Sequence, residues 1–524
     1  MRFSVFNDTE WLYPDTPHNS CRSIYLDGVP GGHAGIQVLG DELTKDAYAY
    51  VQWIEDPVPQ AELFQLLSVG VDENTSPTLM TTTDYESCRD FVTRPAPFRV
   101  YDALRPTDGV LHPAERLALY MTIEIPEDAA PGQYSGMLTI RTEGQGYVLP
   151  LCCTIHPLRI PSVKNARLGM LNFFDYDGLA AQHSVQKNSP KYWELFRKYV
   201  RAQISMRCTH ILLPAGEPIF HNGVLTDFDF SAAEHAGKIA RQEGAKMLCG
   251  GHIAHWKEWD DAEYYPNWDP AVGISTPQGY LQLRLYFSQW AQVIRRNRWQ
   301  SCMTQALADE PQVHNEQTYR VLACMCRKFL PTVSILDAVE TVNLGGGIDI
   351  WVPKQDTYEK CMDSYKALQD AGETMWFYTC AFPAGAAMNR SMDLPLSVSR
   401  LILWMGALYR LSGFLHWGFN YYIGDDIWNR ACCPHKGALL PAGDAHIVYP
   451  GDDGPWRSMR YEMQRAGAED YELLLQAMAL APERVETLIR TVCSDFRTYT
   501  AQGSLVVDAR QRLIYLLEEV GGHG

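Results

Sequence analysis

The spacing of apolar positions changes about 160 residues into the chain. Up to that point apolar and polar side chains alternate in short runs, such as residues 118–125 and 136–141. Clusters rich in proline and glycine separate these runs, as at residues 130–134. Alternation with a period of two is typical of half-buried strands, and many short strands between turns are typical of a sandwich. The pattern predicts an antiparallel β-sandwich domain over residues 1–160.

From residue 161, apolar runs of strand length alternate with stretches that have helical spacing. The eight predicted strands are residues 168–173, 210–213, 246–250, 303–307, 334–339, 348–352, 375–379 and 414–417. The predicted helices are residues 191–206, 232–243, 278–295, 317–328, 357–371 and 394–409. Eight strands that alternate with helices predict a (β/α)8 TIM-like barrel over residues 161–455. The link at residues 341–347 is too short for a helix, so about one barrel helix should be missing.

Amphipathic helices are predicted at the end of the chain, near residues 456–480, 483–500 and 510–519. We expect residues 456–524 to form a helical segment that packs on the barrel. The whole chain is therefore predicted to be a multidomain protein of helices and strands.

Two adjacent carboxylates, Asp309 and Glu310, follow the fourth predicted barrel strand, and Pro311 ends that strand. Barrel enzymes keep their chemistry at this end of the strands, and a carboxylate pair can cleave a glycosidic bond. In a retaining glycosidase the two carboxyls flank the sugar, roughly 5 Å apart. Neighbouring residues approach from one side, which suits a reaction whose nucleophile is the substrate's own acetamido group. The alternative is that these residues belong to an ordinary surface loop.

Composition narrows the classes of partner. Hydrophobic residues make up 46% of the 524 residues, and the 14 Trp and 28 Tyr can supply platforms for sugar faces. A formal charge of −17 disfavours nucleic acid and anionic membranes. The start of the chain has no long apolar leader and no apolar run spans a bilayer, so we expect a cytoplasmic protein without membrane insertion, unless a leader has been removed. The sequence leaves a homo-oligomer open.

Metal and cofactor sites are not predicted. Fourteen cysteines in a chain of this length suggest reduced thiols. The stretch Cys432-Cys433-Pro434-His435 lacks a second half with ligand spacing, and its role stays unexplained. In the loop after the third strand, His252 and Trp256 are candidates for binding sugar hydroxyls. A His-x-x-His metal site with His255, or a plain loop with satisfied histidines, are the alternatives there.

Four segments together resemble glycoside hydrolase family 123, the β-N-acetylgalactosaminidases and their relatives. The segments are Ala308-Asp309-Glu310-Pro311, Asp349-Ile350-Trp351-Val352-Pro353, Trp376-Phe377-Tyr378-Thr379-Cys380 and His416-Trp417-Gly418-Phe419-Asn420-Tyr421-Tyr422. Later pieces around Arg460 and Glu469 extend the likeness, which runs from about residue 100 to 480. His416 departs from it, because a Tyr-like residue is usual there. The resemblance implies an N-terminal β-sandwich and a catalytic barrel.

The resemblance also implies roles. Glu310 would be the general acid/base, which favours a pKa raised toward neutrality, and Asp309 would orient the acetamido group and stabilise the oxazolinium ion. Residues at or after strand ends are further candidates for substrate binding. They are Asp337, Trp351, Tyr378 and Trp417, together with Asn389, Asn420 and Tyr421, which rest on the family likeness.

The favoured hypothesis is a retaining exo-β-N-acetylhexosaminidase that acts on an oligosaccharide or glycoconjugate, with N-acetylgalactosamine as the expected sugar. One rival is a glycosidase that acts on a sugar without an acetamido group and uses Asp337 or Glu340 as nucleophile. The other is a carbohydrate-binding protein on a barrel that has lost its activity.

Overall fold

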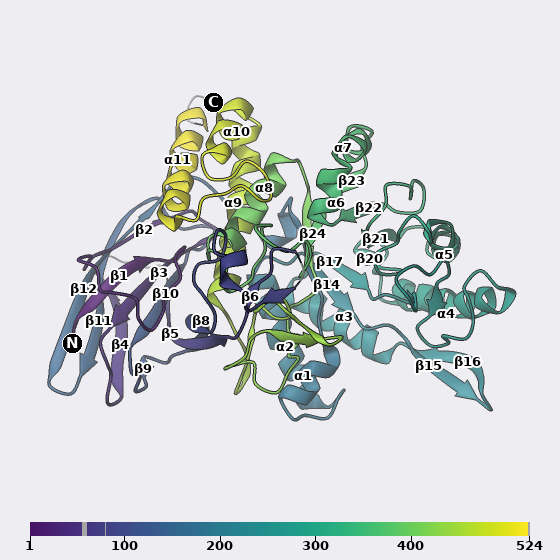
Figure 1. Ribbon diagram of the computed structural model, residues 1–524, viewed down its shortest axis with the longest axis horizontal. Coiled ribbons are helices and arrows are strands. Elements are labelled where there is room, and N and C mark those ends of the chain that lie inside the picture. Colours follow the sequence, from purple (N-terminus) through teal and green to yellow (C-terminus); the bar gives the residue numbers. More distant parts are fainter. Residues whose placement is uncertain (55–59, 79, 522–524) are drawn as a thin grey trace. The chain divides into compact units, whose positions relative to one another are not determined.

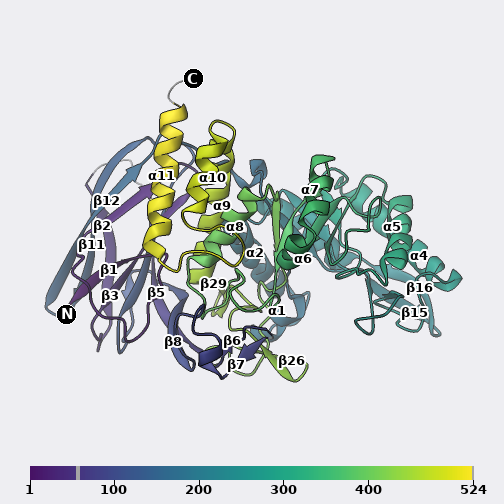
Figure 2. The same cartoon turned by 45° about the horizontal axis from the view of Figure 1, so that its top comes forward.

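A computed structural model describes residues 1–54, 60–78 and 80–521 (Figures 1 and 2). The chain divides into two compact units. The first unit contains residues 1–162, 380–409 and 418–524, and the second contains residues 163–379 and 410–417. Each unit is described below by itself.

Two sheets make up the N-terminal part of the first unit, each of five strands among the described residues. One has the order β1-β3-β10-β5-β8 and the other the order β2-β12-β11-β4-β9. The pairs are antiparallel except for β2 and β12. The strands are β1 (Phe3–Asn7), β2 (Ile24–Gly28), β3 (His33–Gly40), β4 (Ala47–Trp53), β5 (Gln60–Val71), β8 (Phe98–Pro106), β9 (Val110–Leu111), β10 (Ala118–Glu124), β11 (Gly132–Thr142) and β12 (Gln145–Ile155).

Alternating burial along these strands creates one shared core. In β4, Ala47 and Ala49 are buried while Tyr48 and Tyr50 are exposed. Buried side chains from both sheets join in a single hydrophobic cluster, as expected of strands that each hide one face.

Helices complete the first unit, and α9, α10 and α11 stand together in Figures 1 and 2. Ser458 caps α9 by accepting a hydrogen bond from the amide of Tyr461. The helices are α8 (Val398–Leu408), α9 (Met459–Met478), α10 (Pro482–Arg490) and α11 (Gly503–Gly521). Short strand pairs also occur here: β6 (Asn74–Thr75) with β7 (Thr81–Thr82), β26 (Cys433–His435) with β27 (Ala438–Leu440), and β28 (Tyr449–Gly451) with β29 (Gly454–Trp456).

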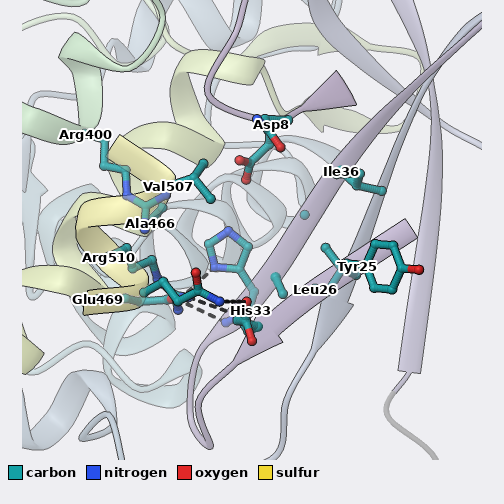
Figure 3. Close-up of a pocket in the computed structure, with 15 residues that line it drawn as sticks. Asp8, Tyr25, Leu26, His33, Ile36, Arg400, Ala466, Glu469, Val507 and Arg510 are labelled. Carbon is teal, nitrogen blue, oxygen red and sulfur yellow. Dashed lines mark hydrogen bonds and ion pairs between the residues drawn. The ribbon is translucent and has the colours of Figure 1, made fainter. Parts of the chain in front are cut away.

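A cavity of about 80 Å³ lies in the first unit and is lined by both apolar and charged residues (Figure 3). His33 points into it from β3, and its Nδ1 lies 2.9 Å from Oε1 of Glu469. Arg400 and Arg510 line the helical side, but both bind the carboxylate of Asp470, at 2.5 and 3.1 Å. The charges around the cavity are thus largely paired with one another.

The second unit is built on a parallel sheet that nearly closes into a barrel. Its order is β23-β22-β21-β20-β17-β14-β13-β25-β24 in the described part of the chain. The two end strands, β23 and β24, are separated only by Trp376, so the sheet begins and ends in one stretch of chain. The strands are β13 (Gly169–Asn172), β14 (His210–Leu213), β17 (Met247–Gly250), β20 (Met303–Gln305), β21 (Ser334–Val339), β22 (Ile350–Pro353), β23 (Thr374–Met375), β24 (Phe377–Thr379) and β25 (Gly413–His416).

Glycines make room for Trp376 at this closure. A Cβ on Gly169 or on Gly413 would lie 2.0 or 2.2 Å from the indole of Trp376. Since such approaches are impossible for a real side chain, glycine is required at both places.

Helices follow most barrel strands. Ser189 and Thr276 cap α2 and α4, each before a proline in the first turn, and Gly244 ends α3 in the left-handed conformation. The helices are α1 (Tyr176–Gln182), α2 (Pro190–Ser205), α3 (Ser231–Glu243), α4 (Pro277–Arg296), α5 (Glu316–Phe329), α6 (Gln355–Lys360) and α7 (Met362–Asp370). The strand pairs β15 (Glu217–His221) with β16 (Val224–Asp229), and β18 (Ala254–His255) with β19 (Tyr265–Pro266), lie in the loops.

The mixed architecture agrees with the sequence at this level: antiparallel sheets come first, and parallel strands with helices follow. Each of the eight predicted barrel strands coincides with a strand or, at residues 374–379, with the split pair β23 and β24. Residues 341–347 form no helix, as expected. None of the helices in the described residues is long and apolar enough to cross a membrane.

Three helical predictions need revision. Helix 357–371 is two helices, broken at Cys361. Helix 394–409 begins only at Val398, after a turn that follows Pro395, and helix 483–500 ends at Arg490.

The N-terminal segment of the first compact unit ends at residue 162. The helix α8 belongs to the first unit because it packs against α9, and the C-terminal helices group with the N-terminal sheets.

Candidate active site

Asp309 and Glu310 follow β20, and the chain on either side of the pair is hydrogen-bonded to β21 or the residue that follows it. Before the pair, the amide of Leu307 donates to both carboxylate oxygens of Asp337 on β21, at 3.0 and 2.9 Å. After the pair, the carbonyl of Pro311 accepts a hydrogen bond of 3.0 Å from the amide of Glu340. These contacts place the pair at the carboxyl end of the barrel strands, where catalytic residues of barrels lie.

The backbone at Glu310 is strained. Its φ is +44°, in the left-handed region that residues other than glycine rarely adopt, and it precedes a proline. Strained dihedrals cluster at functional sites, where the surrounding contacts over-determine them. Asp309 is exposed, while Glu310 is half-buried.

Glu310 lies in a cluster of polar side chains that come from three strand ends. The hydroxyl of Tyr378, on β24, contacts Oε1 of Glu310 and lies 3.0 Å from Oε1 of Glu340. The ammonium of Lys354, which directly follows β22, lies 2.6 Å from the same oxygen of Glu340. Burial, followed by the negative charge of Asp309, raises the pKa of Glu310 to about 7. A carboxyl with this pKa can give and take a proton near neutrality.

The loop after β17 brings His252 and Trp256 to the same region. Nε2 of His252 lies 3.2 Å from Oδ1 of Asp337, and the indole of Trp256 donates to the backbone carbonyl of Asp309 at 3.2 Å. Although burial opposes it, the carboxylate of Asp337 raises the pKa of His252. The ring of Trp256 also meets the half-exposed Trp259 edge to face, with centroids 5.3 Å apart.

A metal site has no support in this loop. His255 contacts the side chain of Asn267 at 3.1 Å, away from His252 and its partner Asp337. Within the described residues, no group of three or more His, Cys, Asp or Glu side chains could hold a metal ion.

Two predicted substrate-binding residues have their polar groups occupied inside the barrel. Asp337 is almost fully buried and also accepts a hydrogen bond of 2.6 Å from the hydroxyl of Tyr319, so it holds the segment that precedes the carboxylate pair. Trp351 is fully buried and donates to Glu373 at 3.1 Å. These contacts favour a positioning role for Asp337 and a core role for Trp351.

The remaining predicted residues divide between the units. Trp417 is half-buried and follows β25 in the second unit. Asn389, Asn420 and Tyr421 belong to the first unit. There the side-chain amide of Asn389 donates to the carbonyl of Cys380 at 2.5 Å, and the backbone of Asn420 forms an isolated antiparallel β-bridge with that of His446.

Lys354 is the residue of the cluster that the sequence did not single out. Its position in the sequence could have revealed it, because Lys354 directly follows the sixth strand, just as Glu340 directly follows the fifth. A charged residue at such a position points to the mouth of a barrel.

Residues 251–477 match the family model described as glycoside hydrolase 123, catalytic domain. The chain carries a family 123 glycoside hydrolase domain. The matched residues include Asp309, Glu310, Glu340, Lys354 and Tyr378, and the predicted resemblance is confirmed. The protein is therefore a glycosidase, with a carbohydrate as its substrate.

One solved structure shares the fold of the chain, and two others are similar over smaller parts of it. A family 123 glycoside hydrolase from Clostridium perfringens, described for glycolipid glycan hydrolysis, has a TM-score of 0.73 at 11% identity, with 99% of this chain and 97% of that chain covered. A family 39 glycoside hydrolase from Bacteroides cellulosilyticus WH2 reaches a TM-score of 0.39 at 10% identity, covering 85% of this chain and 81% of that one. A Parabacteroides merdae β-glucuronidase has a TM-score of 0.33 at 11% identity, with 87% of this chain and 52% of that chain covered. No curated protein sequence matches the chain.

Proposed function

We propose that the family 123 domain is a retaining exo-β-N-acetylhexosaminidase, with β-N-acetylgalactosamine as its preferred sugar, and that catalysis is assisted by the substrate's acetamido group. The observation that carries the proposal is the adjacent pair itself. Asp309 and Glu310 share one stretch of backbone, so they reach the sugar from one side, and Glu310 has a pKa of about 7.

In the first step, the carbonyl oxygen of the 2-acetamido group attacks the anomeric carbon while Glu310 gives its proton to the departing glycosidic oxygen. Asp309, as a carboxylate, binds the acetamido N–H and balances the positive charge of the oxazolinium ion that forms. In the second step, Glu310 removes a proton from water, which attacks the anomeric carbon and reopens the ring. Two inversions give net retention.

The contacts of the other carboxylates speak against a separate nucleophile. Asp337 is buried and accepts hydrogen bonds from Leu307 and Tyr319. Glu340 is paired with Lys354 at 2.6 Å. A nucleophile needs a free oxygen aimed at the anomeric carbon, and both carboxylates have strong donors of their own.

Substrate, fold and compartment complete the proposal. The Clostridium perfringens relative acts on glycolipid glycans, and a glycoconjugate is an equally suitable substrate here. Asn389, Trp417, Asn420 and Tyr421 remain proposed sugar contacts.

We take the N-terminal sheets as a β-sandwich and the parallel sheet as a TIM-like barrel. The described cysteines are all free thiols, which suits a reducing compartment such as the cytoplasm.

The test is hydrolysis of aryl β-glycosides that carry either a 2-acetamido or a 2-hydroxy group. Wild type should cleave the acetamido sugars alone, and Glu310→Gln should lose that activity. Glu217→Gln, in the exposed hairpin of β15 and β16, is the matched control and should behave as wild type. Cleavage of 2-hydroxy sugars alone would contradict substrate assistance.

A further inference from the structure

The hydroxyl of Tyr378 touches two carboxylates at once. It contacts Oε1 of Glu310 and lies 3.0 Å from Oε1 of Glu340. A phenol carries one proton and can donate it to one acceptor at a time. If both contacts are hydrogen bonds, one of the two carboxyls must itself be protonated and donate to the phenol oxygen.

The surroundings decide which carboxyl holds that proton. Oε1 of Glu340 receives the ammonium of Lys354 at 2.6 Å, and its Oε2 receives the hydroxyl of Thr357 at 2.5 Å. Opposite charge and donated hydrogen bonds both favour the ionised form of a carboxyl. In the described residues, no lysine or arginine pairs directly with Glu310. The proton therefore belongs to Glu310.

We propose that Glu340 is a positioning residue that keeps the catalytic proton on Glu310 through the hydroxyl of Tyr378, and that Lys354 is a positioning residue that keeps Glu340 ionised. The chain of donors runs from the Glu310 carboxyl to the phenol oxygen, and from the phenol to the carboxylate of Glu340, which Lys354 neutralises. This inference rests on the proposed role of Glu310 as the general acid.

The same chain serves both halves of the reaction. When Glu310 gives its proton to the leaving oxygen, its O–H bond breaks and the group becomes a carboxylate. The phenol O–H then turns from Glu340 to Glu310 and stabilises the new charge, while Lys354 and Thr357 still satisfy Glu340. When Glu310 takes a proton from water, the original arrangement returns. The phenol keeps its own proton throughout.

Several groups act on the proton of Glu310. Burial and Asp309 raise its pKa most, a hydrogen bond from Tyr378 to the carboxylate lowers it, the negative charge of Glu340 raises it, and Lys354 lowers it. From the loop after β17, His252 and Tyr264 also lie within electrostatic range of the pair. The charged and titratable groups around Glu310 are Asp309, Tyr378, Glu340, Lys354, His252 and Tyr264.

Opposite shifts of a pH profile test the arrangement. Because the acid must be protonated, kcat/KM falls where Glu310 ionises. Glu340→Gln removes a negative charge, so the basic limb should move to lower pH. Lys354→Met removes a positive charge that lowers the pKa of Glu310, so the basic limb should move to higher pH. A charge at this range shifts a pKa by about one unit, which is a tenfold change in kcat/KM on the basic limb.

Controls separate this effect from damage to the fold. Lys360→Met, at the end of α6, removes an exposed lysine that pairs with Asp356 and should leave the profile unchanged. If Lys354→Met does not fold, Thr357→Val removes one donor to Glu340 without changing charge, and should shift the limb in the same direction by less. In a Tyr378→Phe background the effect of Glu340→Gln should shrink.

A readout without substrate keeps the two proposals distinguishable. The infrared band of protonated carboxyls can be titrated in the free enzyme, and the band missing from Glu310→Gln belongs to Glu310. Opposite shifts of this band in Glu340→Gln and Lys354→Met would support the arrangement, whatever wild type cleaves. If wild type cleaved no acetamido sugar, that result would refute the proposed function but not the arrangement. Shifts in the same direction, or none, would overturn the arrangement whatever the substrate.

Discussion

Both units of the protein contain buried carboxylates, but the partners of these carboxylates differ. In the first unit, the fully buried Asp102 accepts hydrogen bonds from Arg460 at 3.0 and 2.9 Å and from the hydroxyl of Tyr449 at 2.6 Å. Asp470 accepts from Arg400 at 2.5 and 2.9 Å and from Arg510 at 3.1 Å. Asp102 and Asp470 are thus each paired with an arginine guanidinium, and the surrounding fold holds the carboxylate and the guanidinium in place.

In the second unit, the half-buried Glu310 and Glu340 lie near the ammonium of Lys354, which pairs with Glu340. Glu310 has no arginine or lysine bound to its carboxyl in the described residues, and its pKa is raised by burial and by the charge of Asp309. Paired buried charges hold the fold together, whereas a carboxyl with a raised pKa and no cationic partner suits the proton transfer proposed for Glu310. Arg460, which contributed to the family likeness, has structural contacts.

The largest effect should come from Glu310→Gln. Loss of a general acid lowers kcat/KM by about 10²- to 10⁴-fold, and the loss should be smaller for aryl leaving groups of low pKa, which need less protonation. Because the change removes a carboxyl whose ionised form is disfavoured, the melting temperature should not fall. Steady-state kinetics and calorimetry check both statements. A large fall in melting temperature would place Glu310 with the structural charges.

Arg460→Met should lower the stability of the fold, which Glu310→Gln should not. Breaking a buried ion pair by removing one partner costs about 3–5 kcal/mol, because Asp102 would stay buried without its guanidinium. Arg484→Met, which removes an exposed pair with Glu519, is the matched control and should change stability little. Urea unfolding of the two variants gives the comparison. Equal stability would show that the buried pair contributes nothing.

The pH dependence of wild type should reflect the unpaired charge. We expect kcat/KM to fall above about pH 7, where Glu310 ionises. The folded-state pKa of Glu310 lies above its value in the unfolded chain, so its ionisation should reduce stability as pH rises from about 4.5 to 7. Melting temperatures of wild type and Glu310→Gln over this range should therefore diverge with rising pH. Parallel curves would contradict the raised pKa.

Asp8 is an exception within the first unit and should give the smallest effect. It borders the cavity of Figure 3, and burial raises the pKa of its carboxyl despite the nearby charges of Arg400 and His33. Its ionised form is thus disfavoured by folding, and Asp8→Asn should stabilise the protein slightly at neutral pH. The gain should vanish at a pH below the ordinary pKa of aspartate. A loss of stability at neutral pH would mean that the ionised Asp8 supports its neighbours.

Much of the fold was readable in the sequence. The barrel strands are short apolar runs between turn residues, and local composition suffices to find them. The carboxylate pair was found in the same way, because Asp309 and Glu310 directly follow such a run.

The rest depends on long-range contacts. The left-handed backbone of Glu310 lies between Leu307 and Pro311, which form hydrogen bonds to Asp337 and Glu340. The cluster of Tyr378, Glu340 and Lys354 joins three strand ends that are far apart in the sequence. The apolar sequence of α8 shows that the helix is buried, but not that α9 packs against it.

The most direct test of the account is the rate of hydrolysis of aryl 2-acetamido-β-galactosides whose acetyl group carries zero, one, two or three fluorine atoms. Fluorine withdraws electrons from the carbonyl oxygen and makes it a poorer nucleophile. If the acetamido group attacks the anomeric carbon, as the adjacent pair of Asp309 and Glu310 implies, kcat/KM should fall with every fluorine added. Rates that stay constant along the series would contradict substrate assistance, and with it the roles given to both carboxylates.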